Sequence, residues 1–96
     1  MFRHCVMFTW NDQITDEAKA SISAGLDVMA GLDSVRAYHH GPDAGVSEGN
    51  WDYAVVGDFE SVDDYMNYAD DPGHRSLITE KVAPYVDGRV AVQFEI

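Results

Sequence analysis

One short stretch of the chain, residues 68–74, places side chains that can exchange protons at a corner of the backbone. Pro72 and Gly73 interrupt one helical pattern, and His74 opens the next. Tyr68 lies just before this corner, and His4 adds a second imidazole near the N-terminus. A histidine exchanges a proton near neutral pH, and a tyrosine hydroxyl donates or accepts a hydrogen bond. Tyr68, His74 and His4 are therefore the candidates for an acid–base site.

Each candidate has a catalytic and a structural interpretation. In the first, His74 is a general base that removes a proton next to a carbonyl group, and Tyr68 orients it or stabilises the oxyanion. In the second, His74 caps the last helix, and His4 makes a structural hydrogen bond to His74 or Tyr68 because a buried imidazole needs a polar partner. Three aromatic residues are candidates to line a substrate pocket, or else belong to the core: Trp10, Tyr53 and Phe59.

Hydrophobic periodicity predicts the elements that hold these residues. Alternating apolar side chains indicate strands over residues 2–10, 35–40, 51–59 and 89–96. Apolar residues at helical spacing indicate a helix that Thr15 caps and that stops near Gly31. Ser61 followed by Asp64 opens a second, short helix, and after the corner a third helical stripe continues to about Pro84.

The predicted order of elements is βαββαβ, which is the ferredoxin-like arrangement of the α+β class, in one domain spanning residues 1–96. In this fold the helices cover one face of the sheet only. The strands here carry apolar residues on both faces, so the second face needs a cover. We expect a homodimer in which two sheets pack face to face as a dimeric α+β barrel, with residues 89–96 in the contact.

Charge and composition exclude several classes of protein. The net charge is −11 and only six residues are Lys or Arg, so the chain has no basic stripe for nucleic acid and an anionic membrane surface would repel it. The same acidity mildly disfavours anionic substrates. No apolar run reaches the roughly 20 residues that span a bilayer. Cys5 is the single cysteine, so no internal disulfide forms and the chain is expected to be cytoplasmic.

The sequence predicts neither a metal nor a cofactor. His39 and His40 are adjacent on a strand, so they point to opposite faces and cannot hold one metal together. The glycine-containing loop at residues 41–45 precedes a strand instead of a helix and carries an acidic group, so it is no phosphate cradle.

Several segments, taken in order, resemble the stress-responsive dimeric α/β-barrel (Dabb) family along nearly the whole chain. They are residues 3–8, 52–56, 59–61 and 68–74. The corner of that family reads His-Pro-x-His. Here Asp71 stands in place of the first histidine, while Pro72 and His74 match the pattern.

The resemblance implies a homodimeric barrel. Most members of the family have no assigned reaction, but a minority, the polyketide cyclases of the olivetolic acid cyclase type, perform cofactor-free aldol chemistry in a pocket between sheet and helices. Their site residues fall on His4, Tyr68 and His74, while Tyr53 stands where they carry a further histidine.

Three classes of function follow. The first is a cofactor-free cyclase or lyase acting on a carbonyl or polyketide-like compound. The second is a non-catalytic, stress-responsive dimer that binds a small apolar or aromatic ligand, and a third is an oxygenase of the related antibiotic-biosynthesis type. A cavity beside His74 that could hold a multi-ring compound would favour the first class.

Overall fold

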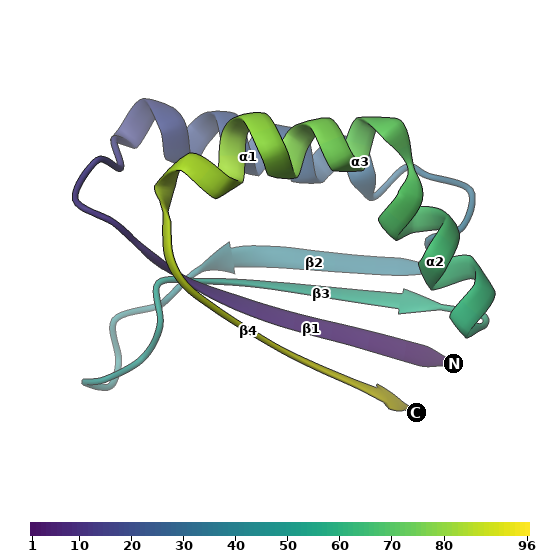
Figure 1. Cartoon of the computed structure of the whole chain (residues 1–96). Coiled ribbons are helices and arrows are strands. Elements are labelled where there is room, and N and C mark those ends of the chain that lie inside the picture. The colour runs from purple at the N-terminus through teal and green to yellow at the C-terminus, as the bar shows by residue number, and fades with distance from the viewer.

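The computed structural model describes residues 1–96 as a four-stranded antiparallel sheet with all helices on one face (Figure 1). The strands lie in the order β2-β3-β1-β4. Their bounds are β1 (Phe2–Trp10), β2 (Ala37–Pro42), β3 (Tyr53–Phe59) and β4 (Val86–Glu95). The helical elements are α1 (Asp16–Met29), α2 (Val62–Asp70), α3 (Pro72–Ser76), the π-helical segment η1 (Leu77–Val82) and the 3₁₀ turn η2 (Ala83–Tyr85). This order confirms the predicted ferredoxin-like α+β fold.

Strand β1 is central and pairs with β3 on one side and β4 on the other. Its even-numbered residues His4, Val6 and Phe8 are buried beneath the helices, whereas Met7 on the opposite face is 45 % exposed. This is the alternation that a strand with one covered face requires. The strand therefore places one imidazole in an otherwise apolar layer.

Side-chain caps start all three α-helices. The Thr15 hydroxyl accepts a hydrogen bond from the backbone N–H of Ala18, and the Ser61 hydroxyl accepts one from Asp64. The Asp71 carboxylate accepts from the N–H of His74 and so caps α3. Three buried residues of α1 face the sheet: Ile22, Leu26 and Met29.

Several boundaries differ from the sequence prediction. The third strand begins at Tyr53 instead of residue 51, and the second strand ends at Pro42 instead of residue 40. The second strand begins at Ala37 instead of residue 35, because the N–H of Val35 is engaged in a turn with the carbonyl of Leu32. The first helix ends at Met29, and Gly31 is not in the left-handed conformation that glycine caps use. The last strand begins at Val86, three residues earlier than predicted.

The last helical stripe is also less regular than predicted. Helix α3 is only five residues long and gives way to η1 and then η2. A π-helical turn is wider than an α-helical one, and such turns occur frequently at functional sites. Here Ile78 and Val82 of η1 lie next to the cavity described below.

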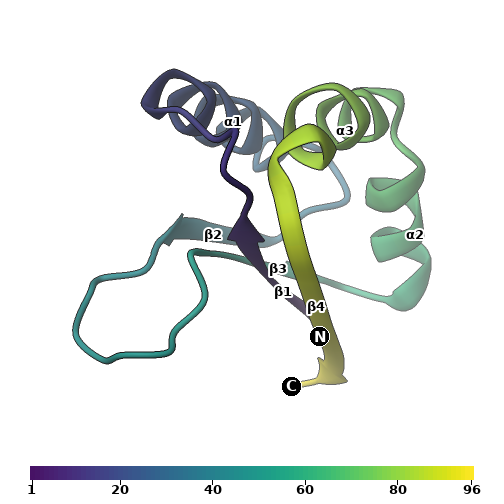
Figure 2. The same cartoon turned by 60° about the vertical axis from the view of Figure 1, so that its left-hand side comes forward.

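The second face of the sheet has no cover within the chain. Figures 1 and 2 show every helix on the same side of the strands and no helix on the other side. Five exposed apolar residues lie on this outer face or at its end: Met7, Val90, Val92, Phe94 and Ile96. No helix is long and apolar enough to cross a membrane.

Phe59 provides a test of the core. It ends β3 with no exposed surface, and its ring packs against those of Tyr65 and Tyr68. We expect Phe59→Ala to lower the free energy of unfolding by about 3–5 kcal/mol, because the cavity it leaves adds to the lost burial. Met66→Ala, at a position 46 % exposed, should change it by less than about 0.5 kcal/mol. Urea denaturation of both variants measures the difference, and equal stabilities would contradict this assignment.

Candidate functional site

Three elements bring the predicted acid–base residues to one cavity. His4 of β1, Tyr68 of α2 and His74 of α3 all line a cavity of about 300 Å³ between the sheet and the helices. Its other lining residues are mainly apolar: Val6, Phe8, Ile22, Leu26, Val55, Tyr65, Ile78, Val82 and Arg89. We call this the first cavity. The residues that the sequence singled out are therefore neighbours, although more than 60 positions of the chain separate His4 from the other two.

The corner between α2 and α3 sets the position of His74. The N–H of Asp71 donates to the carbonyl of Tyr68 as α2 ends, and the Asp71 carboxylate caps α3. Pro72 occupies the first turn of α3, where its missing N–H costs nothing. The rings of Tyr68 and His74 then lie with their centroids 4.3 Å apart.

His74 is held as a neutral base. Its Nδ1 lies 3.2 Å from the carbonyl oxygen of Ala69, and because a carbonyl only accepts, Nδ1 carries the proton. The neutral ring therefore keeps a free lone pair on Nε2. Burial lowers the pKa of His74, although the bond to Ala69 and the charge of Asp71 oppose that shift. His74 can thus accept a proton near neutral pH.

His4 has the opposite tautomer. It is 5 % exposed, and its Nδ1 lies 3.0 Å from the side-chain nitrogen of Gln93 on β4. An amide nitrogen only donates, so Nδ1 accepts and the neutral ring carries its proton on Nε2. Burial lowers the pKa of His4 to about 4, and the positive charges of Arg89 and of His74 in its protonated form add to the shift. His4 is thus a neutral N–H donor, and its structural partner is Gln93 instead of His74 or Tyr68.

Two residues of this site carried no signal that singled them out in the sequence. The Tyr38 hydroxyl on β2 lies 2.7 Å from the Tyr68 hydroxyl, and burial raises the pKa of both groups, that of Tyr68 to about 12. Arg89 on β4 pairs in register with Phe8 and borders the first cavity. Strand alternation places both residues on the inner face, but only the sheet order reveals which neighbours they meet there.

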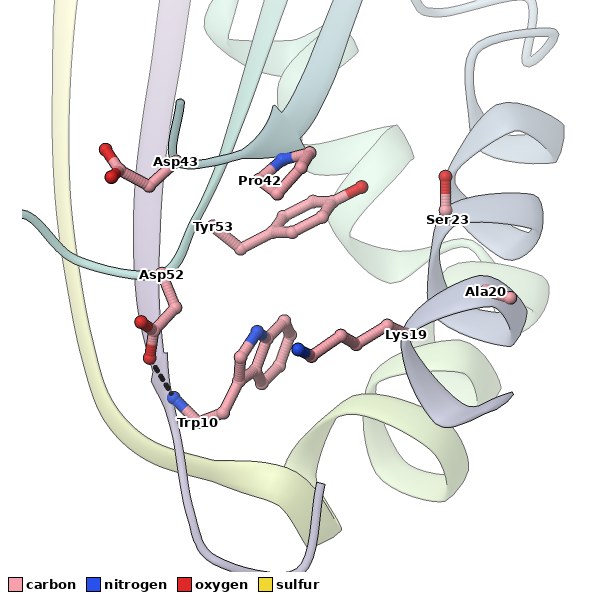
Figure 3. Close-up of a pocket in the computed structure, with 8 residues that line it drawn as sticks. All are labelled: Trp10, Lys19, Ala20, Ser23, Pro42, Asp43, Asp52 and Tyr53. Atoms are coloured by element: carbon pink, nitrogen blue, oxygen red, sulfur yellow. Dashed lines mark hydrogen bonds between the residues drawn. The ribbon is translucent and has the colours of Figure 1, made fainter. Parts of the chain in front are cut away.

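The predicted pocket aromatics separate into two groups. Trp10 and Tyr53 line a second cavity of about 500 Å³, between the end of the sheet and α1 (Figure 3). The two rings lie with centroids 5.8 Å apart. Phe59 lines neither of these cavities, because β3 ends at this residue and its ring is enclosed by Tyr65 and Tyr68. Phe59 is thus a core residue, which is the second of the two interpretations that the sequence left open for it.

The sequence predicted only that His39 and His40 point to opposite faces of a strand and so cannot bind one metal ion together. The structure places His40 on the inner face, where its ring nitrogens contact Asp27 and Tyr53, and His39 is exposed. No group of three or more His, Cys, Asp or Glu side chains has the spacing to hold a metal ion.

The low pKa of His4 predicts how stability depends on pH. The unfolded chain binds a proton at an ordinary histidine pKa of about 6.5, but folded His4 binds one only near 4. Stability should therefore fall as pH is lowered through this range, by about 1 kcal/mol between about pH 7 and pH 5 after allowing for solvent screening. His4→Gln should flatten this slope in chemical denaturation, whereas His39→Gln, at an exposed position, should keep it. An unchanged slope in His4→Gln would show that folded His4 titrates normally.

Comparisons with known proteins agree with this fold. A crystal structure of a dimeric ferredoxin-like protein of unknown function from Thermobifida fusca YX is 35 % identical, with a TM-score of 0.92 over 99 % of this chain and 90 % of that one. A Dabb family protein from Mesorhizobium loti is 15 % identical, with a TM-score of 0.82 over 99 % of this chain and 95 % of that one. The hydroxynitrile lyase of Passiflora edulis is 20 % identical, with a TM-score of 0.84 over 99 % and 92 % of the two chains.

No curated protein matches the sequence. The family model described as the stress responsive A/B barrel domain, Dabb, matches residues 2–96. The match covers both the central strand that carries His4 and the corner that carries His74. The chain therefore belongs to the stress-responsive α/β-barrel (Dabb) family.

Proposed function

We propose that this chain forms a homodimeric barrel and that its first cavity performs cofactor-free acid–base chemistry on a small carbonyl compound. The observation that carries the proposal is the meeting of His4, Tyr68 and His74 at one mostly apolar cavity. Burial keeps both imidazoles neutral, and a perturbed group in a cleft is the usual mark of a functional site.

The two tautomers suggest different roles for His74 and His4. Nε2 of His74 is free to take a proton from the carbon next to a carbonyl group, which leaves an enolate. The Nε2–H of His4 can donate a hydrogen bond to the oxygen on which the negative charge develops. Tyr68 packs beside His74 with its ring tilted by 42°, and its bond to Tyr38 holds its hydroxyl in place. The proton returns from His74 when the product forms, so the cycle needs no cofactor.

The size of the first cavity restricts the substrate. A volume of about 300 Å³ is at the lower end of the range for small-molecule sites. It suits a compound with one ring better than the multi-ring compound that would favour a polyketide cyclase. A lyase-type reaction on a small carbonyl compound is therefore preferred to cyclisation of a long polyketide. The fold shared with a hydroxynitrile lyase is compatible with this preference.

Exchange of carbon-bound hydrogen tests the chemistry without knowledge of the natural substrate. We expect the protein to accelerate exchange of the methyl protons of acetophenone in deuterated water, followed by proton NMR. His74→Ala should reduce this rate by roughly 10² to 10⁴, the usual contribution of a general base. Arg75→Ala, the exposed neighbour on the same helix, should leave the rate unchanged.

A non-catalytic ligand-binding dimer is the second candidate, and the apolar lining of the first cavity favours it. In that case acetophenone would bind without exchange. His74→Ala lowers the free energy of unfolding by about 1–3 kcal/mol in either case, because the carbonyl of Ala69 would lose its donor. The exchange rate of the parent protein therefore separates the two functions, and a thermal melt of the variant measures the structural contribution of His74.

The homodimer is proposed from the uncovered outer face of the sheet. Met7, Val90, Val92 and Phe94 lie side by side on β1 and β4, where the register pairs Met7 with Val90. A contiguous exposed apolar patch marks an interaction surface, and a second identical sheet matches it in shape and polarity. The dimeric relative from Thermobifida fusca supports this arrangement. A cytoplasmic location belongs to the same proposal, since one cysteine allows no internal disulfide.

A charge on the outer face should separate the subunits. Val92 is 60 % exposed in the single chain, and Val92→Lys would bury an ammonium group in the proposed contact. We expect light scattering to give a dimer for the parent protein and a monomer for this variant at micromolar concentration. Val28→Lys makes the same change at a 67 % exposed position of α1, away from the sheet, and should remain dimeric. A monomeric parent protein would contradict the proposed homodimeric barrel.

A further inference from the structure

The second cavity borders a chain of hydrogen bonds that the proposed reaction does not use. Nε2 of His40 lies 2.6 Å from Oδ1 of Asp27, and Nδ1 of His40 lies 2.7 Å from the hydroxyl of Tyr53. Asp27 lies on α1, His40 on β2 and Tyr53 on β3. Asp27 is exposed to solvent while Tyr53 is only 6 % exposed, so the chain leads from the surface to the cavity.

The chemistry of the three groups fixes the direction of their protons. An ionised carboxylate only accepts, so Nε2 of His40 carries the proton that Asp27 receives. Where the imidazole of His40 is neutral it has a single N–H, so Nδ1 is then unprotonated and takes its hydrogen bond from the Tyr53 hydroxyl. Burial raises the pKa of Tyr53, while a hydrogen bond with the Ser23 hydroxyl lowers it and the charge of Asp27 raises it further. The Tyr53 hydroxyl therefore stays protonated, and Ser23 is one partner of its oxygen. With that proton engaged by His40, the Tyr53 oxygen offers only lone pairs to other partners.

The two carboxylates that line the second cavity already accept hydrogen bonds from within the chain. Figure 3 shows the rings of Trp10 and Tyr53 on one side and Lys19, Ala20 and Ser23 of α1 on the other. Asp52 is engaged by the backbone N–H of Trp10. Asp43 likewise accepts from the N–H of Gly45 and the side chain of Asn50.

The second cavity shares no lining residue with the first, so the two are separate candidates for ligands. Its volume of about 500 Å³ lies within the range of small-molecule sites. An aromatic ring can lie against Trp10, whose neighbour Tyr53 presents the lone pairs of its oxygen.

We propose that the second cavity is a separate binding site for a phenol-type ligand, whose ring packs on Trp10 and whose hydroxyl donates to the Tyr53 oxygen. An aromatic compound that can only accept a hydrogen bond has no donor to meet at this oxygen. Selectivity thus depends on the proton direction in the chain from Asp27 through His40. This site does not depend on the reaction proposed for the first cavity.

Phenol and anisole form a matched pair of probes, because anisole has the same ring but no hydroxyl proton. We would follow backbone and indole NMR signals of the full chain during titration at about pH 8.5, above the ordinary pKa of histidine. Phenol should bind about 2- to 10-fold more tightly than anisole, which is the value of one net hydrogen bond. The shifted signals should include those of Trp10 and Tyr53.

Variants assign this preference to one cavity. Tyr53→Phe should abolish it, whereas Tyr68→Phe, which changes the first cavity, should leave it intact. Equal affinity for the two probes in the parent protein, or shifts confined to the first cavity, would overturn the proposal.

Asp27→Asn tests the proton direction itself. The introduced amide can donate to Nε2, which lets the His40 proton move to Nδ1 and turns the Tyr53 hydroxyl towards the cavity. The preference for phenol should then disappear or reverse, while Asp63→Asn, an equal charge change on α2, should retain it. Nitrogen-15 shifts of the His40 ring report the tautomer without any ligand. A protonated Nδ1 in the parent protein would contradict the proposal, even if a variant failed to fold.

Discussion

The pairing of β1 with a strand on each side is the constraint on which the rest of the structure depends. Both ladders run along nearly the full length of the strand, so the faces to which its side chains point cannot change independently of the sheet. A slip by one residue would expose Val6 and Phe8 and bury Met7. The same slip would move His4 from the cavity to the outer face. The hydrophobic core and the candidate site are therefore fixed by one alternation.

The corner at Asp71 is the second determinant of the candidate site, because it both starts α3 and positions His74. A histidine at that position would match the usual pattern of the family, yet the aspartate serves as the cap of α3. The cap holds His74 beside Tyr68, while the carbonyl of Ala69 at the end of α2 selects the tautomer. Structural hydrogen bonds thus prepare the ring as a proton acceptor. The structural and catalytic interpretations of His74 are therefore compatible, because Nδ1 makes the structural hydrogen bond and Nε2 is left for the proposed proton transfer.

Buried polar groups in this molecule are arranged so that each is satisfied. No buried side-chain nitrogen or oxygen lacks a hydrogen-bond partner. The tautomers of three histidines follow from this, since each ring has one partner whose role is fixed: an amide, a carbonyl and a carboxylate. A strongly acidic chain can therefore hold neutral, oriented imidazoles in its interior.

The sequence by itself determined the fold class and identified His4, Tyr68 and His74 as candidates for one site, because strand alternation and the Pro72-Gly73 break are local signals with few solutions. Their meeting at one cavity was decided by the packing of α2 and α3 on the sheet. The sequence could not decide whether Phe59 lines a pocket or belongs to the core, since an inward-facing aromatic residue has the same place in the strand alternation in both cases. The bonds of Tyr38 to Tyr68 and of His40 to Asp27 and Tyr53 each join different elements. Only the order of the strands and the placement of α1 over them decided those contacts, because a hydrogen bond between distant residues depends on geometry that no local spacing encodes.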